Sequence, residues 1–229
     1  MSAIEQVDSM WNDHNIPRKE VYEHTLQASE ADPENPELLW RLCRGSYEYA
    51  IEKEVPKELK KKLTYERMDI ANKALSLSPE SPDCNKWVGI CMNEVDEYES
   101  VVTKLNDAMK IREYFTKASE LSTTDPMASH LLGRWCFRVS DMSWVERAAA
   151  RAMAGHLAPH ATFEEALENF LKSEDMRPGH LKMNTWFIVQ TYSKLKKKKE
   201  AKEWAAKVVA MPNLLEEDFD IDVKAKAYL

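Results

Sequence analysis

The segment "DPMASHLLGRWCFRV", residues 125–139, has two counterparts earlier in the chain, "NPELLWRLCRGSYEYA" (35–50) and "SPDCNKWVGICMNEV" (81–95). Each carries a proline that is followed six and seven residues later by an apolar residue and a small one. The three sets are Pro36 with Leu42-Cys43, Pro82 with Val88-Gly89, and Pro126 with Leu132-Gly133. Proline suits the first turn of a helix, and a small residue lets a neighbouring helix approach closely. Each segment therefore predicts the first helix of a helix pair, here called helix A.

A second register competes with this one. Gly45, Gly89 and Gly133 are equally spaced, and aligning the segments on them would shift the prolines by two positions. We prefer the register in which the prolines align, because it keeps every proline in the first turn of its helix.

Each unit also contains a second helix, here called helix B, that runs toward a later proline. These helices lie in the segments 70–82, 112–126 and 163–178. Residues 21–33 predict a similar lone helix before the first unit, and residues 184–195 and 199–212 predict a final pair. The positions of the small, aromatic and proline residues resemble the tetratricopeptide repeat, whose period is about 34 residues.

The spacing here is longer than in that repeat. The proline-to-proline intervals are 46 and 44 residues, and the next interval is longer still. About ten extra residues add roughly three helical turns. The sequence therefore predicts an all-α protein, a tetratricopeptide-like α-solenoid of antiparallel helix pairs with lengthened or inserted helices.

Composition agrees with a helical globular protein. Charged residues make up 31% of the 229 residues, and only five glycines occur. The four cysteines show no CxxC spacing, which favours reduced thiols in a core. The beginning of the chain has no basic segment followed by an apolar one, and no stretch approaches about 20 apolar residues, so we expect neither a signal peptide nor a transmembrane segment.

Charge is unevenly distributed. Residues 1–40 hold nine acidic and two basic residues, a balance that equals the net charge of −7 of the whole chain. We therefore expect an acidic and in part disordered N-terminal segment (1–20), a repeat domain (21–213), and an acidic tail or capping helix (214–229). The asymmetry also suggests the hypothesis that the acidic first 30 residues fold back onto the basic groove described below and inhibit it.

A candidate groove follows from the repeat. In tetratricopeptide folds helix A lines the concave wall, and counting from each proline places Arg44, Lys86, Arg134 and Arg138 there among aromatic residues. Guanidinium groups bind carboxylates or phosphates through two parallel hydrogen bonds, so such a wall suits an acidic peptide or an anionic lipid headgroup. The complete set of predicted groove residues is Trp40, Arg44, Tyr47, Lys86, Asn93, His130, Arg134, Phe137, Arg138, Trp144, Arg147 and Arg151.

The insert "DMSWVERAAARAMAGHL" (141–157) supplies the last members of that set. Arg147 and Arg151 lie four residues apart and share one helix face, while Trp144, Ala148 and Met153 are expected to pack inward. One interpretation is a lid over the groove, and the other is a helix that extends the core and displays its arginines to water.

A lysine run follows near the turn of the last helix pair. Its interpretations are a solvated loop and a cationic patch for a polyanion. Its members are Lys194, Lys196, Lys197, Lys198, Lys199 and Lys202.

Catalytic and metal-binding patterns are not found. His156 and His160 are four residues apart, but Gly155 and Pro159 favour a surface turn there over a zinc site. No nucleotide-binding glycine motif, nucleophile motif or calcium loop occurs. We therefore expect a protein that is not an enzyme and has no cofactor and no metal.

Several of these segments resemble the regulator of microtubule dynamics family. The resemblance covers about residues 36–212 and rests on "LLWRLCRGSYE", "NKWVGICMNEVDEYE", "REYFTKASEL", "HLLGRWCFRVSDMSWVERAAARAM" and "TFEEALENF". It implies a tetratricopeptide-like domain, microtubule association, and roles in spindle organisation and chromosome segregation. Relatives with a membrane anchor sit on mitochondria or at organelle contacts, and their repeat domain can bind phospholipid. Without such an anchor here, the resemblance implies a short cytosolic member located in the cytoplasm and on the cytoskeleton, the spindle and its poles.

Three functions remain open from the sequence. The first is a microtubule-associated adaptor in mitosis, in contact with tubulin directly or through a partner. The second is a module that binds or transfers an anionic lipid. The third is a peptide-binding scaffold for regulatory mitotic proteins, and nucleic acid is not an expected partner.

Overall fold

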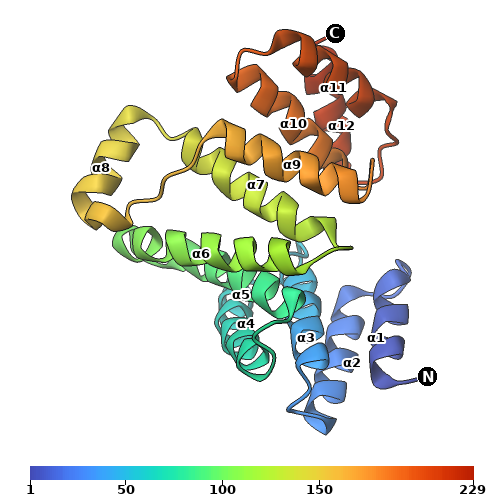
Figure 1. Ribbon diagram of the computed structural model, residues 1–229. Helices are drawn as coiled ribbons and strands as arrows, with labels where there is room; N and C mark the ends of the chain where they lie inside the picture. Colours follow the sequence, from blue (N-terminus) through green and yellow to red (C-terminus); the bar gives the residue numbers. More distant parts are fainter. The chain divides into compact units, whose positions relative to one another are not determined.

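The computed structural model describes residues 1–229 and contains helices but no strands (Figure 1). It divides into two compact units, residues 1–121 and 122–229, which are described separately. The first unit contains α1 (Ala3–Asn12), α2 (Arg18–Ala31), α3 (Pro36–Ala50), α4 (Lys57–Leu77), α5 (Pro82–Val95), a short 3-10 helix (Asp96–Tyr98) and α6 (Val101–Leu121). The second contains α7 (Pro126–Ser140), α8 (Trp144–Ala154), a 3-10 helix (Gly155–Leu157), α9 (Phe163–Met176), α10 (Lys182–Lys194), α11 (Lys198–Ala210) and α12 (Glu216–Lys226). The predicted all-α, tetratricopeptide-like architecture is confirmed.

Helices α3, α5 and α7 begin at the three prolines that the sequence aligned. In each case the residue before the proline is an N-cap whose side chain accepts a hydrogen bond from a backbone N–H of the first turn. The caps are Asn35, Ser81 and Asp125. Proline removes an N–H that has no partner inside the helix, and the cap satisfies another, so both residues fix the start of helix A.

The small residue of each helix A lies against its helix B. A Cβ atom on Gly89 would come within 2.6 Å of Phe115 in α6, and one on Gly133 within 2.7 Å of Phe170 in α9. Cys43 occupies the equivalent place, where its thiol donates to the backbone carbonyl of Arg67 in α4 at 3.6 Å. Gly45 instead faces α2. The preferred proline register is therefore confirmed.

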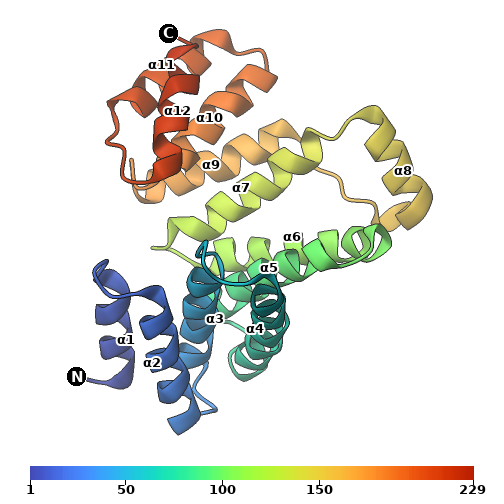
Figure 2. The ribbon, with the colours of Figure 1, turned by 180° about the vertical axis from the view of Figure 1, so that it is seen from behind.

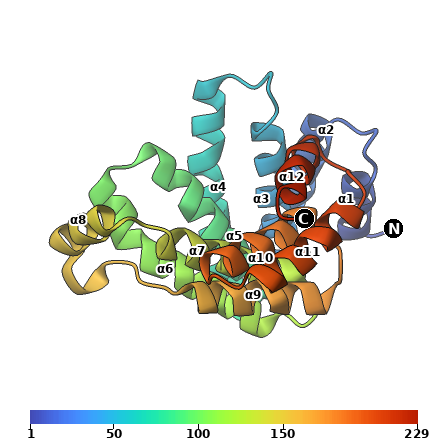
Figure 3. The ribbon, with the colours of Figure 1, turned by 90° about the horizontal axis from the view of Figure 1, so that it is seen from above.

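The longer repeat has two structural causes. Helices α4 and α6 are 21 residues each, which lengthens the first two pairs. In the third pair, α8 stands between α7 and α9, and it projects away from both (Figure 3). The α7 and α9 helices nonetheless pack closely against each other. Lengthened and inserted helices both occur.

Each unit has its own core. In the first, Trp40 and Trp87 are buried with cysteines and small residues between α3, α4 and α5. In the second, the Phe187 ring packs between the rings of Phe137 and Phe170, with centroid distances of 5.4 Å to Phe137 and 5.2 Å to Phe170.

Both terminal segments contain a helix, and each packs on its own unit (Figure 2). In α1 the Ser2 and Glu5 side chains form a capping box, and Val7 is buried. In α12 the side chains of Ile221 and Ala225 are buried against α10 and α11. The domain boundaries expected at residues 20 and 213 stay predictions. No helix combines the length and the apolar content needed to cross a membrane.

Candidate functional site

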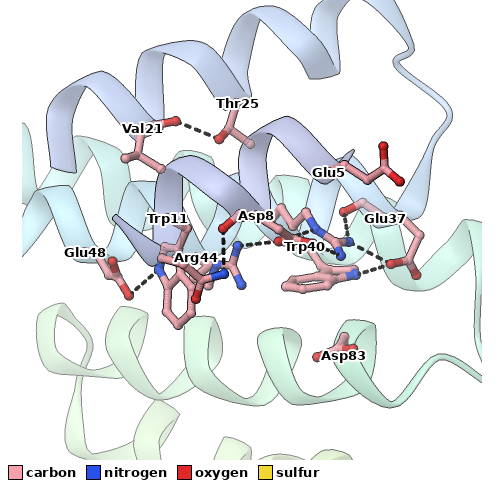
Figure 4. Close-up of polar contacts among 12 residues, drawn as sticks. Glu5, Asp8, Trp11, Val21, Thr25, Glu37, Trp40, Arg44, Glu48 and Asp83 are labelled. Atoms are coloured by element: carbon pink, nitrogen blue, oxygen red, sulfur yellow. Dashed lines mark hydrogen bonds and ion pairs between the residues drawn. The ribbon is translucent and has the colours of Figure 1, made fainter. Parts of the chain in front are cut away.

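Arg44 on α3 lies at the centre of a polar cluster that α1 completes (Figure 4). Its guanidinium carbon is 4.1 Å from the centroid of the Trp11 ring and 5.2 Å from that of Trp40, so the charge is held between two aromatic rings. One Nη donates to the Asp8 carboxylate at 2.9 Å. Of the predicted groove residues in the first unit, Trp40 and Arg44 are thus brought together.

Asp8 accepts three charge-assisted hydrogen bonds. Arg41 donates from Nε and Nη2 to the two carboxylate oxygens, at 2.9 and 2.7 Å, and Arg44 supplies the third bond. Burial alone would raise the pKa of Asp8, but the hydrogen bonds from both arginines outweigh burial and lower that pKa. The carboxylate is therefore charged at neutral pH and bound in the fork geometry that arginine favours.

A second contact holds the end of α1. The Trp11 indole N–H donates to the Glu48 carboxylate at 2.8 Å, and Arg18 donates to the Trp11 carbonyl at 2.8 Å. The Arg18 Nε also lies 3.3 Å from the other oxygen of Glu48. Both ends of the Asp8–Trp11 turn are therefore bonded to α2 and α3.

The other predicted positions of this unit lie further along the same helices. The Tyr47 ring meets the Trp87 ring edge-on, with centroids 6.1 Å apart. The Lys86 ammonium pairs with Asp83 at 2.6 Å, and Asn93 is exposed on α5. The positive charge of Lys86 is thus already balanced by a neighbour on its own helix.

Sequence reasoning missed Arg67, which is the largest fully buried side chain of the chain. It donates to the hydroxyl groups of Ser46 and Thr64, and Glu94 lies 4.0 Å away. Burial raises the pKa of Glu94, and Arg67 lowers it in part. A usable signal existed, because residue 67 falls on the buried stripe of α4 between Leu63 and Ala71.

In the second unit, two predicted groove residues belong to the core. His130 is fully buried, and its Nδ1 is 3.0 Å from the Asn184 amide oxygen. Burial is the main cause that lowers the pKa of His130 to about 4, so the ring is neutral at pH 7. Phe137 is buried between Phe163 and Phe187. The expectation that these two side chains face a ligand is wrong, since they fill the space between their own helices.

Arg134 and Arg138 are exposed on α7. The guanidinium of Arg134 lies over the Phe187 ring, 5.7 Å from its centroid. The predicted convergence of these arginines with Arg44 and Lys86 joins residues of two units and stays a prediction.

The expectation for the inner face of α8 is wrong. Trp144 is 80% exposed, Met153 is 48% exposed, and Ala148 is exposed as well. Only Ala150 of this helix is buried. The reason is that α8 projects away from α7 and α9, so no neighbouring helix of its unit covers that stripe.

The arginines of α8 help to form a pocket of about 280 Å³. Arg147 donates to the backbone carbonyls of Ser140 and Met142, at 2.9 and 3.0 Å, and so joins α8 to the end of α7. The pocket is lined by Val139, Arg147, Arg151, Gly155, His156, Ala158, Pro159, His160 and Ala161. Two of these nine residues are arginines, whose charge favours an anion, and no group of three His, Cys, Asp or Glu residues is placed to hold a metal ion.

The lysine run lies at the turn between α10 and α11, as the sequence predicted. Lys196 has a positive φ of 60°, which turns the backbone. Lys194 pairs with Asp141, and Lys202 donates to the backbone carbonyl of Leu229. The remaining members, Lys196 to Lys199, are all exposed.

Comparison with known proteins places this chain in a family. The family described as "Regulator of microtubule dynamics protein 1-3" matches residues 3–229. The chain belongs to this family. Among its members, regulator of microtubule dynamics protein 1 of Mus musculus is 36% identical over 211 residues, which are 92% of this chain and 68% of the mouse protein. Protein 3 of Bos taurus is 30% identical, over 95% of this chain and 46% of the bovine protein.

Solved structures show the fold of this family member. A thermophilic TPR protein of Thermus thermophilus aligns with a TM-score of 0.62 at 11% identity, over 99% of this chain and 96% of that one. YrrB, described as a TPR protein with an unusual peptide-binding site, aligns with a TM-score of 0.52 at 16% identity, over 98% and 90% of the two chains.

Proposed function

We propose that this protein is a non-enzymatic, microtubule-associated adaptor that acts in spindle microtubule organisation and chromosome segregation. It binds acidic partners through its lysine run and the basic side chains of helix A, in the cytoplasm and on the spindle and its poles. Membership of the family supports the microtubule part of this proposal. The observation that carries the mode of binding is the exposure of four successive lysines, Lys196 to Lys199.

The lysine run suits an acidic surface better than the net charge suggests. A charge of −7 would repel a negatively charged filament if it were evenly spread. Exposed ammonium groups grouped at one turn create a local positive potential, and such patches steer association with acidic partners. The acidic C-terminal tails of tubulin are partners of this kind.

The test is co-sedimentation of the full chain with microtubules, before and after enzymatic removal of the tubulin tails. We expect binding that depends on the tails and weakens with added salt. Replacing Lys197, Lys198 and Lys199 by Glu should reduce the affinity roughly tenfold or more. These substitutions leave Lys196 in place, because its positive φ shapes the turn.

A matched control comes from the start of α4. Lys57, Lys61 and Lys62 are also exposed lysines in the first turns of a helix, so their replacement by Glu changes the net charge equally. This control should bind microtubules nearly as well as the unaltered chain. Equal losses in both variants would mean that net charge alone matters, and binding without the tails would contradict a direct electrostatic contact and point to a relay through another protein.

The pocket beside α8 favours a second candidate function, that of a module for an anionic lipid. Arg151 and His156 line it from the two sides of the turn at Gly155. Flotation with vesicles that contain phosphatidic acid, compared with neutral vesicles, tests this candidate. Arg151→Gln should reduce flotation with the acidic vesicles, and equal flotation with both kinds would exclude a headgroup site here.

A further inference from the structure

Helix α1 packs on α2 and α3, and it covers the basic face of α3 with the side that carries Asp8 and Trp11 (Figure 4). Its contacts follow a short pattern: Val7 is buried, Asp8 binds two arginines, and Trp11 packs on one of them. Asp8 and Trp11 are three residues apart, so they lie on the same face of α1. The face of α3 therefore receives a carboxylate and an aromatic ring from a single helix.

The carboxylate of Asp8 is the one acid that this face takes from α1. With α1 in place, Asp8 and Glu37 balance Arg41 and Arg44. Arg41 keeps Glu37 as a partner if α1 leaves, since that bond lies within α3. Arg44 would lose its carboxylate and its Trp11 ring, and its Nε has no hydrogen-bond partner even with α1 bound. A displaced α1 thus leaves Arg44 without its hydrogen-bonded carboxylate, and Glu48, one turn further along α3, stays as its nearby acid.

The attachment of α1 depends on a few polar contacts and little buried apolar surface. A ten-residue helix is marginal in water by itself, so α1 stays helical only while it is docked. Val7 is the one buried residue of this helix. The Asp8 side chain is 34% exposed, so solvent screens part of its ion pairs with the arginines. The residues that connect α1 to α2, 13–17, are mostly exposed.

We infer that α1 is a displaceable, built-in ligand, and that the α3 face beneath it binds an acidic helix of a partner protein that carries a carboxylate three residues before an aromatic ring. This inference rests on the proposed function, because it names the partner of one basic helix-A position and the way in which the position is regulated. While α1 is docked it blocks the α3 face, and a partner helix with the same pattern of side chains competes with α1 for that face.

The residues around the α3 face favour a ligand with a single carboxylate over a ligand with a run of negative charges. Glu37 lies beside Arg41, and Glu48 lies beside Trp11, at the two ends of the face. A polyanion laid across α3 would meet both acids and be repelled. The α3 face and the lysine run therefore select different acidic partners.

The experiment uses the full chain and a fluorescent peptide with residues 1–15 of this sequence as the probe. Asp8→Asn removes the charge that holds α1 but keeps the shape of the side chain. Glu30→Gln is the matched control, since it removes one exposed acid of the same region that touches no arginine. We expect the peptide to bind Asp8→Asn at least about tenfold more tightly than the unaltered chain or Glu30→Gln, because the competing α1 is released.

Two further variants define the contact. A peptide with Asn in place of Asp8 should lose binding, and so should a chain that combines Asp8→Asn with Arg44→Gln. Equal affinity of the peptide for all chains, or no binding up to millimolar peptide, would overturn the inference.

Hydrogen exchange provides a second measurement on the unaltered chain. Excess peptide should speed the exchange of the α1 amides and leave those of α5 unchanged, which also shows that the chain stays folded. Unchanged α1 exchange alongside saturated peptide binding would place the peptide elsewhere and overturn the inference. Tail-dependent microtubule binding together with a failed peptide test would leave the proposed function standing and reject this inference alone.

Discussion

Gly133 shows how one missing side chain sets the distance between two helices. A Cβ at this position would come within 2.7 Å of the Phe170 ring, which is itself fully buried and has no room to move. Gly89 stands in the same relation to Phe115. The close contact of α7 with α9, and of α5 with α6, therefore depends on the missing side chains of Gly133 and Gly89.

Gly133→Ala should therefore destabilise the protein by about 1–3 kcal/mol, the usual cost of forcing extra volume into a packed core. Gly45→Ala is the control, because its Cβ would come no closer than 3.4 Å to Tyr22. There the better helix propensity of alanine, up to about 1 kcal/mol, should leave stability unchanged or higher. Urea unfolding of both variants measures the difference, and equal effects would contradict the close approach.

His130 makes stability depend on pH in a defined window. Its pKa is about 4 in the folded protein and 6.5 in an unfolded chain. Below pH 6.5 the unfolded chain takes up a proton that the folded one refuses, so stability is complete above that pH and is lost as the pH falls toward 4. This residue should lower the free energy of unfolding by about 2 kcal/mol between pH 7 and pH 5.

The measurement is urea unfolding at both pH values for the unaltered chain, for His130→Gln and for His156→Gln. The first variant should lose about 2 kcal/mol less than the unaltered chain between pH 7 and pH 5. The second replaces an exposed ring and should behave like the unaltered chain. Identical pH dependence in all three would show that His130 is not buried in its neutral form.

Helix α8 is the element that departs most from an ordinary repeat. It has its own capping box, in which Ser143 and Glu146 bond each other's backbone, so its start is fixed locally. Its large apolar side chains, Trp144, Val145 and Met153, nevertheless lie in solvent, and Arg147 bonds it to the end of α7. Local sequence thus forms this helix, while no core of its own unit receives it.

Trp144→Ser should accordingly change the free energy of unfolding by less than about 0.5 kcal/mol, as for other exposed sites. Trp186→Ala in α10 is the contrasting variant, because that ring is buried between α10 and the C-terminal residues. It should cost about 3–5 kcal/mol. A large loss on replacing Trp144 would mean that the ring is covered in solution.

At the scale of the whole molecule, the ion pairs between helices decide which charges stay unpaired, and the net charge does not. The acidic beginning of the chain is partly neutralised by Arg41 and Arg44, and the acidic end by Lys182, which pairs with Asp222 at 2.8 Å. The exposed lysines from 196 to 199 have no comparable set of partners, apart from Glu203 at 4.0 Å from Lys199. Positive charge at this turn thus stays largely unpaired, although the net charge of the chain is −7.

The helix pairs, their register and the insertion were predictable from sequence. Proline favours the first turn of a helix, and glycine lets the next helix approach closely because it has no side chain. Both residues therefore recur at regular intervals along the sequence. The turn of the lysine run was equally predictable. Residues whose role follows from the regular spacing of the repeat could be placed without a structure.

The partners of the polar side chains could be identified only from the tertiary structure. Asp8 meets Arg44 across 36 residues, and His130 meets Asn184 across 54. Helical periodicity assigns a residue to a face, but it does not say which distant face will cover it. For that reason His130 and Phe137 were expected at a ligand and lie in a core, Trp144 was expected to pack inward at the groove and lies in water, and the burial of Arg67 was missed. A charge becomes paired, exposed or buried only when another helix packs against it, because its free energy depends on the atoms that replace water around it.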